Sequence, residues 1–220
     1  MKVKREKLLN VVVVFCGFSL VLSGCSNDEI LMPEITHDYS STSIPIIPEI
    51  EITTPTPSSA VMPASWIPPS HLKRRWTAIM IHHSATKNGN ATIFDRWHRE
   101  DRNWDGIGYD FVIGNGTDSP NGQVEVTFRW RQQRTGAHCG GTPGNWANES
   151  GIGICLVGDF SKSAPTRRQM NSLLQLVRFL QKRFSIPRSR IYGHKDVPGA
   201  HITNCPGSYF PMAQLKSMLD

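Results

Sequence analysis

The sequence predicts an α/β fold in which a mixed central β-sheet is flanked by helices. From about residue 72, short apolar segments of strand length alternate with segments of helical periodicity. Their order is β-α-β-β-β-α-β, and such alternation is typical of a sheet with helices packed on it. The chain has 220 residues, of which 39% are hydrophobic, and this is enough for one substantial core.

The first three elements form a strand, a helix and a hairpin. WTAIMIHH (76–83) is a mostly apolar run that ends in polar residues, as in a buried strand. ATIFDRWHRED (91–101) predicts a short helix with Thr92 as its N-cap. GIGYDFVIGNG (106–116) predicts a strand that ends in turn residues, and it pairs with VEVTFRW (124–130) as a hairpin.

The remaining elements are a second buried strand, a long helix and a short final strand. GIGICLVGDF (151–160) is the buried strand. The segment 166–184 has apolar residues spaced i, i+3 and i+4, which predicts an amphipathic helix, and Thr166 with Gln169 can form a capping box at its start. SRIYGH (189–194) predicts the last strand.

The first 70 residues differ in composition from the rest. A basic start, MKVKREK, precedes an apolar run that is too short and wrongly flanked for a spanning helix, so we expect a signal peptide over residues 1–24. Residues 25–70 are rich in Pro, Ser and Thr and predict a tether. Residues 71–220 then form a single globular domain.

The segment LSGC (22–25) resembles the lipobox of bacterial lipoproteins. The resemblance implies cleavage before Cys25 and a diacylglycerol on its sulfur. Because Ser26 follows, it also implies transfer to the outer membrane, with the domain facing the periplasm, if the host is Gram-negative. An ordinary signal peptide or an uncleaved anchor are the alternatives.

The charge of the chain excludes few partners. The net charge is +6. The N-terminal segment contributes +3 of it, through four cations (Lys2, Lys4, Arg5 and Lys7) and one anion (Glu6), so the rest of the chain carries +3. This mild excess suits a polyanionic cell wall or a membrane surface, and by itself it selects neither. The sequence has no nucleic-acid-binding motif and no nucleotide-binding glycine loop.

The cysteines suggest a specific task for one thiol. Cys16 falls in the predicted signal peptide and Cys25 at the lipidation site, so Cys139, Cys155 and Cys205 remain. An odd number in an exported domain means that at least one is unpaired or has another role. A disulfide between Cys139 and Cys155 is an open possibility, because sequence alone does not reveal its geometry.

Metal-ligating residues follow the ends of predicted strands. His82 and His83 close the first strand, His194 closes the last, and Cys205 lies in the loop after it. Zn²⁺ accepts imidazole nitrogen and thiolate sulfur, and a catalytic zinc site has three protein ligands and an open position. Two histidines and one cysteine would fill such a site, whereas the alternative is a core cysteine and surface histidines.

Six segments resemble those of the type 2 N-acetylmuramoyl-L-alanine amidases, a family that includes phage amidase-type lysozymes and peptidoglycan recognition proteins. In chain order they are WTAIMIHHSAT (76–86), GIGYDFVI (106–113), GAH (136–138), GIGICL (151–156), GHKDV (193–197) and TNCPG (203–207). The resemblance covers about residues 72–219. It implies the amidase/peptidoglycan recognition protein-like fold and zinc-dependent hydrolysis of the bond between N-acetylmuramic acid and L-alanine.

The resemblance also assigns the central site residues. His82, the first of the paired histidines, His194 and Cys205 become the ligands of one Zn²⁺ per chain. Tyr109 matches the family's active-site tyrosine and is implied to assist proton transfer. Thr203 is implied to donate a hydrogen bond to a developing oxyanion. The alternatives are a core tyrosine and a loop threonine bonded to its own backbone.

Further residues follow from the same resemblance. His138 and Asn148 match positions that are implied to contact the substrate, although His138 could instead orient a metal ligand or be structural. We expect His83 to be packed or hydrogen-bonded. Position 155 is Cys where some amidases of this fold have a catalytic Glu, so the role of base passes to Tyr109 and to the hydroxide on the metal.

Two other functions remain open at this stage. One is a peptidoglycan-binding module without catalysis, although recognition proteins of that kind lack the cysteine ligand. The other is a zinc endopeptidase that acts within the stem peptide. We expect a monomer that binds peptidoglycan or muropeptides and reaches the membrane through the lipid on Cys25. The stem-peptide preference and the biological role stay undetermined.

Overall fold

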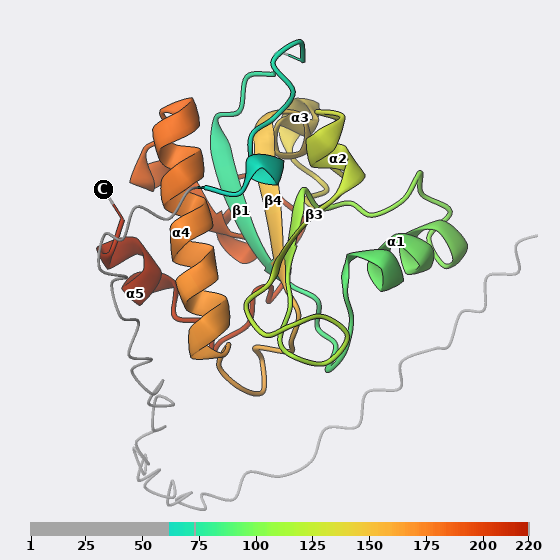
Figure 1. Ribbon diagram of the computed structural model, residues 1–220, viewed down its shortest axis with the longest axis vertical. Helices are drawn as coiled ribbons and strands as arrows, with labels where there is room; N and C mark the ends of the chain where they lie inside the picture. Colours follow the sequence, from blue (N-terminus) through green and yellow to red (C-terminus); the bar gives the residue numbers. More distant parts are fainter. Residues whose placement is uncertain (1–61, 73, 220) are drawn as a thin grey trace, which may run out of the picture. The chain divides into compact units, whose positions relative to one another are not determined.

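The computed structural model describes residues 62–72 and 74–219 and contains a five-stranded sheet in the order β3-β2-β4-β1-β5 (Figure 1). β1 is parallel to β4 and to β5, β2 is parallel to β4, and β3 is antiparallel to β2. The strands are β1 Ala78–His83, β2 Phe111–Ile113, β3 Val124–Val126, β4 Gly151–Leu156 and β5 Ile191–Gly193. The sheet confirms the predicted mixed α/β class.

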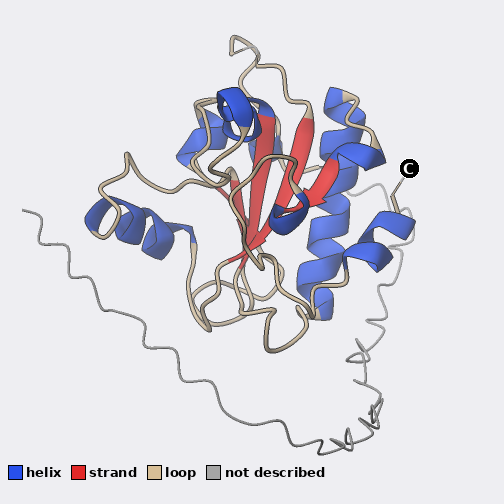
Figure 2. Cartoon of the chain, turned by 180° about the vertical axis from the view of Figure 1, so that it is seen from behind, coloured by secondary structure: helices blue, strands red, loops and turns tan. Residues whose placement is uncertain are grey.

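Helices cover both faces of the sheet (Figures 1 and 2). α4 and α5 pack on one face, and α1 and α3 pack on the other. The α-helices are α1 Ala91–Glu100, α2 Phe128–Arg131, α3 Trp146–Ser150, α4 Arg167–Phe184 and α5 Met212–Ser217. Short 3₁₀ helices are η1 Ala64–Trp66, η2 Pro143–Asn145, η3 Arg188–Arg190 and η4 His194–Asp196.

The alternation of side chains along β1 decides which face carries the site. Ile79 and Ile81 join the core beneath α4. Since successive side chains of a strand point to opposite faces, Met80 and His82 lie on the other face. Cys155 of β4 is paired in register with His82. The predicted metal ligand therefore lies on the face away from α4.

The predicted capping box of α4 is confirmed. Thr166 Oγ1 accepts a hydrogen bond from the Gln169 backbone N–H at 3.1 Å, and Gln169 Oε1 accepts one from the Thr166 N–H at 3.1 Å. The Gln169 amide also donates to the carbonyls of Val157 at 2.9 Å and Ile113 at 3.2 Å. These bonds tie the start of α4 to the ends of β2 and β4.

The prediction of Thr92 as the cap of the first helix is wrong, because the cap is Asn90, whose Oδ1 accepts from the Ile93 N–H at 2.8 Å. The second hairpin strand ends at Val126, since Thr127 caps α2. Neither α3 nor α5 was predicted.

The strand predicted over residues 106–116 is shorter than expected. β2 begins only at Phe111, and side chains of α1 bind two backbone N–H groups of the segment before it. Asp95 accepts from the Ile107 N–H at 2.8 Å, and His98 Nδ1 accepts from the Gly108 N–H at 3.0 Å.

The predicted signal peptide, the lipidation site Cys25 and nearly all of the predicted tether fall outside the residues that the structure describes. Among residues 62–72 and 74–219, no helix has the length and apolar character that a membrane crossing requires.

Candidate metal centre

His82, His194 and Cys205 converge at one edge of the sheet. His82 lies near the end of β1, and His194 directly follows β5. These strands are parallel neighbours, so their carboxyl ends meet, and the loop after η4 brings Cys205 to the same place. Each residue offers one ligand atom, and the three atoms lie within 4.8 Å of one another. The predicted ligand set is therefore assembled by the fold.

The geometry of these side chains fits a zinc ion. A tetrahedral zinc, with a Zn–S bond of about 2.3 Å and a Zn–N bond of about 2.0 Å, separates sulfur from nitrogen by about 3.5 Å. His82 Nδ1 lies 3.7 Å from Cys205 Sγ. His194 Nε2 is buried and has no hydrogen-bond partner among the described residues, whereas buried polar atoms normally have one. A cation bound to this nitrogen would provide that partner.

The protonation of the three side chains also suits a metal. Burial lowers the pKa of His82 and of His194, so both imidazoles are neutral at pH 7 and present a lone pair. Burial raises the pKa of Cys205 to about 12, and the His83 backbone N–H, 3.4 Å from the sulfur, opposes this shift. Because the ligand is the thiolate, metal binding here is coupled to release of the thiol proton.

His138 and Asn148 are buried beside the centre. His138 Nδ1 lies 3.2 Å from His82 Nε2, and burial lowers the pKa of His138 to about 3. Asn148 Oδ1 accepts from the backbone N–H groups of His138 and Cys139, each at 2.9 Å. Both side chains use their polar atoms within the protein, which favours the orienting role for His138. Substrate binding by either residue stays a prediction.

Tyr109 lies against the ring of His82, at 5.2 Å between centroids. Part of the residue is exposed, but burial of its phenol raises the pKa of Tyr109 well above 10, and the nearby Cys155 thiol raises it further. The phenol therefore stays protonated, which favours a hydrogen-bond donor over the base that we expected.

Thr203 occupies the loop that carries Cys205. Its Oγ1 accepts a hydrogen bond from the Cys205 backbone N–H at 3.2 Å, which is the contact with its own loop that the alternative interpretation predicts. The hydroxyl hydrogen is not used in this bond and is available to a substrate oxygen. The structure thus places the threonine next to a ligand and leaves its catalytic role a prediction.

The other candidates are structural. His83 Nδ1 accepts from the Phe160 N–H at 3.1 Å, and its ring packs on the Phe160 ring, so the expected packed role is confirmed. Cys139 and Cys155 are free, buried thiols in separate clusters, so the structure does not form the disulfide that the sequence left open.

Sequence analysis did not single out Asp110, which follows Tyr109. Its carboxylate is fully buried, Oδ2 accepts from the Gly153 N–H at 2.9 Å, and Oδ1 has no partner among the described residues. Burial raises the pKa of Asp110 to about 7. An acidic residue within an apolar strand pattern was the available signal, because a buried carboxylate is costly unless it is paired.

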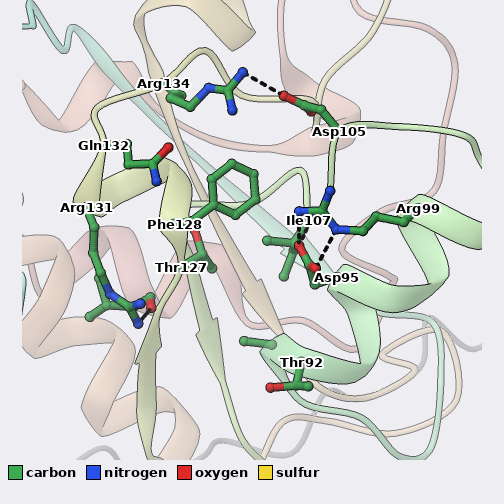
Figure 3. Close-up of a pocket in the computed structure, with 12 residues that line it drawn as sticks. Thr92, Asp95, Arg99, Asp105, Ile107, Thr127, Phe128, Arg131, Gln132 and Arg134 are labelled. Carbon is green, nitrogen blue, oxygen red and sulfur yellow. Dashed lines mark hydrogen bonds and ion pairs between the residues drawn. The ribbon is translucent and has the colours of Figure 1, made fainter.

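Two cavities lie on either side of α1. One, of about 280 Å³, is bordered by Tyr109, whose ring contacts that of His82. The other, of about 640 Å³, lies between α1 and α2, and none of the predicted site residues lines it (Figure 3). There Arg99 pairs with Asp95 at 2.8 Å and Arg134 with Asp105 at 3.0 Å. Of the predicted site residues, the smaller cavity is lined by Tyr109 alone.

Relatives of known sequence match the globular part of the chain. The mouse (Mus musculus) N-acetylmuramoyl-L-alanine amidase is 26% identical over 152 residues, which cover 64% of this chain and 26% of that protein. Peptidoglycan-recognition protein SC2 of Drosophila melanogaster is 30% identical over 138 residues, covering 59% of this chain and 67% of that protein. The chain thus spans about a quarter of the mouse relative's length.

Solved structures share the fold. The N-acetylmuramoyl-L-alanine amidase LysC from Clostridium intestinale has a TM-score of 0.55 and 30% identity, covering 66% of this chain and 85% of that one. Bumblebee PGRP-SA has a TM-score of 0.52 and 27% identity, covering 66% of this chain and 83% of that one. The family described as Amidase_2, N-acetylmuramoyl-L-alanine amidase, matches residues 72–208. With this match over more than half of its length, the chain belongs to the N-acetylmuramoyl-L-alanine amidase family.

Proposed function

We propose that this protein is a zinc-dependent N-acetylmuramoyl-L-alanine amidase, which hydrolyses the amide bond between N-acetylmuramic acid and L-alanine in peptidoglycan. The observation that carries the proposal is the convergence of His82, His194 and Cys205 within 4.8 Å in a chain of the amidase family. A module that only binds peptidoglycan has no need of a complete ligand set, so this convergence favours an enzyme.

His82, His194 and Cys205 would hold the zinc ion. In such a site Zn²⁺ lowers the pKa of water from 15.7 to about 7 and polarises a carbonyl oxygen. Hydrolysis breaks the C–N bond, adds OH to the carbonyl carbon and adds a proton to the nitrogen of L-alanine. The other contributions to catalysis come from side chains near the three ligands.

Tyr109 and Thr203 are the residues that we assign to these contributions. The protonated phenol of Tyr109 donates a hydrogen bond toward the reacting groups and helps deliver the proton to the departing amine. Thr203 donates its hydroxyl hydrogen to the carbonyl oxygen as negative charge develops there. The cavity of about 280 Å³ beside Tyr109 gives room for part of the substrate.

Digestion of isolated peptidoglycan tests the proposal. We expect the purified full-length chain to release intact stem peptides that begin with L-alanine, as identified by mass spectrometry. A chelator should stop the release, and added zinc should restore it, because the ligand set holds the metal reversibly. Shortened stems that remain attached to muramic acid would contradict the amidase and favour an endopeptidase. Binding without any cleavage would favour the non-catalytic module.

We also propose that residues 1–24 are a lipoprotein signal peptide, that Cys25 is lipidated and that residues 25–70 tether the domain of residues 71–220. The proposed location is the periplasmic face of the outer membrane, and the proposed form is a monomer. The lipobox resemblance at 22–25 and the Pro-, Ser- and Thr-rich composition support this arrangement.

Metabolic labelling with a fatty acid tests the anchor. The wild type should carry the label and Cys25→Ala should not, because the substitution removes the sulfur that accepts the lipid. Cys16→Ala is a matched control, and it should be labelled like the wild type because Cys16 lies in the segment that is removed. Equal labelling of wild type and Cys25→Ala would contradict the lipobox interpretation.

A further inference from the structure

A buried series of hydrogen bonds runs from the backbone to the metal centre through His138. Its Nε2 lies 3.3 Å from the carbonyl oxygen of Gly151, and its Nδ1 lies 3.2 Å from His82 Nε2. His82 Nδ1, at the opposite corner of that ring, lies 3.7 Å from Cys205 Sγ. The two imidazoles thus connect a fixed carbonyl group to the place of the metal.

This arrangement determines where each proton lies. A carbonyl oxygen can only accept, so the nitrogen of His138 that faces Gly151 carries the hydrogen. In a neutral imidazole the other nitrogen is then an acceptor, and His82 Nε2 must donate to it. The second nitrogen of His82, Nδ1, is left with a free lone pair, and this is the atom that faces Cys205.

We propose that His138 is a positioning residue, which fixes the tautomer and ring orientation of His82 so that Nδ1 is always ready to bind the metal. The inference rests on the proposed function, because it assumes that His82 is a metal ligand. Of the roles that the sequence left open for His138, it selects the orientation of a metal ligand over contact with the substrate.

The backbone around His138 is built to hold the ring in place. The Asn148 amide oxygen accepts from the N–H groups of His138 and Cys139, and its amide nitrogen donates to the Cys139 carbonyl at 3.0 Å. Gly153 leaves space for the ring, since a Cβ there would lie 2.4 Å from His138 Cδ2. Gly136 also leaves space, since a Cβ there would lie 2.6 Å from the same Cδ2 atom. These contacts limit the imidazole to one position.

Two substitutions separate the positioning role from simple packing. In His138→Asn, the side-chain oxygen reaches roughly the place of Nδ1 and can still accept from His82. In His138→Gln, the amide nitrogen reaches roughly the place of Nε2 and keeps only the bond to Gly151. A positioning role predicts that Asn is the better substitute. A packing role predicts Gln, because its volume is closer to that of histidine.

The readout is zinc affinity of the purified full-length chain, measured by competition with a chromophoric chelator. We expect His138→Gln to weaken zinc binding by about 10- to 100-fold, the usual effect of losing a partner of a ligating histidine, and His138→Asn to lose clearly less. Equal affinity in the wild type and His138→Gln, or tighter binding by His138→Gln than by His138→Asn, would overturn the inference.

A second measurement needs no variant. Long-range ¹H–¹⁵N correlation spectra of the histidine rings distinguish the two tautomers, and we expect both His82 and His138 to carry hydrogen on Nε2. Hydrogen on His82 Nδ1 in the metal-free protein would overturn the inference. A wild type that binds zinc but cleaves no peptidoglycan would overturn the proposed function instead, and the order of zinc affinities would still decide the inference.

Discussion

Replacement of Cys205 by serine should lower the rate of peptidoglycan hydrolysis by about 10³-fold or more. A metal ion in such a site contributes several kcal/mol to stabilisation of the transition state, and each 1.4 kcal/mol corresponds to about a factor of ten in rate. Cys205 offers the sulfur among the three ligand atoms that lie within 4.8 Å of one another, and a serine hydroxyl is a far poorer ligand for zinc than a thiolate.

Zinc content and product release should be measured together for Cys205→Ser. We expect both to fall, with binding to peptidoglycan retained. Cys139→Ala is the matched control, because Cys139 is also a free thiol but is not one of the three grouped ligands, and it should keep zinc and activity. If Cys205→Ser digested peptidoglycan as fast as the wild type, the assignment of a zinc amidase would be wrong.

Replacement of Asp110 by asparagine should remove a pH dependence of stability on the order of a few kcal/mol. Burial raises the pKa of Asp110 from 3.8 to about 7 in the folded protein. The carboxyl therefore binds its proton more tightly when folded, and the stability that it contributes is present below about pH 4 and lost as the pH rises through about 7. The asparagine side chain has no such titration and can still accept from the Gly153 N–H.

The measurement is the free energy of unfolding in urea at several pH values between 4 and 8. The wild type should lose stability across this interval relative to Asp110→Asn, by up to about 1.4 kcal/mol per pH unit. Asp118→Asn, which alters an exposed carboxylate, is the control and should follow the wild type. Identical pH dependence in the wild type and Asp110→Asn would show that the buried carboxyl titrates as in the unfolded chain.

The sequence predicted helices and strands most accurately where a repeated pattern of apolar residues lay within one continuous segment. The helix α4 and its capping box extend over one continuous segment, and both are confirmed. The start of α1 and the length of β2 were wrong, because neighbouring residues decide them. Asn90 rather than Thr92 caps α1, and side chains of α1 bind the backbone N–H groups of Ile107 and Gly108 ahead of β2.

The residues of the candidate site also differ in how much of their role the sequence could predict. The resemblance of six segments to those of the amidases implied His82, His194 and Cys205 as ligands, and the fold brings them together. The role of His138 was left open by its residue type alone. Its bond to His82 joins residues 56 positions apart, and its bond to Gly151 depends on space left by Gly153. No local pattern contains this information.

The sequence by itself determined the α/β class and the long capped helix, because periodicity and caps are properties of short segments. Its three candidate ligands followed from the resemblance of six segments to those of the amidases. The tertiary structure alone decided which nitrogen of His82 faces Cys205, 123 positions away, and which group supports that ring from behind. Such choices depend on the packing of distant segments, where a shift of about 1 Å changes which atoms can form a hydrogen bond.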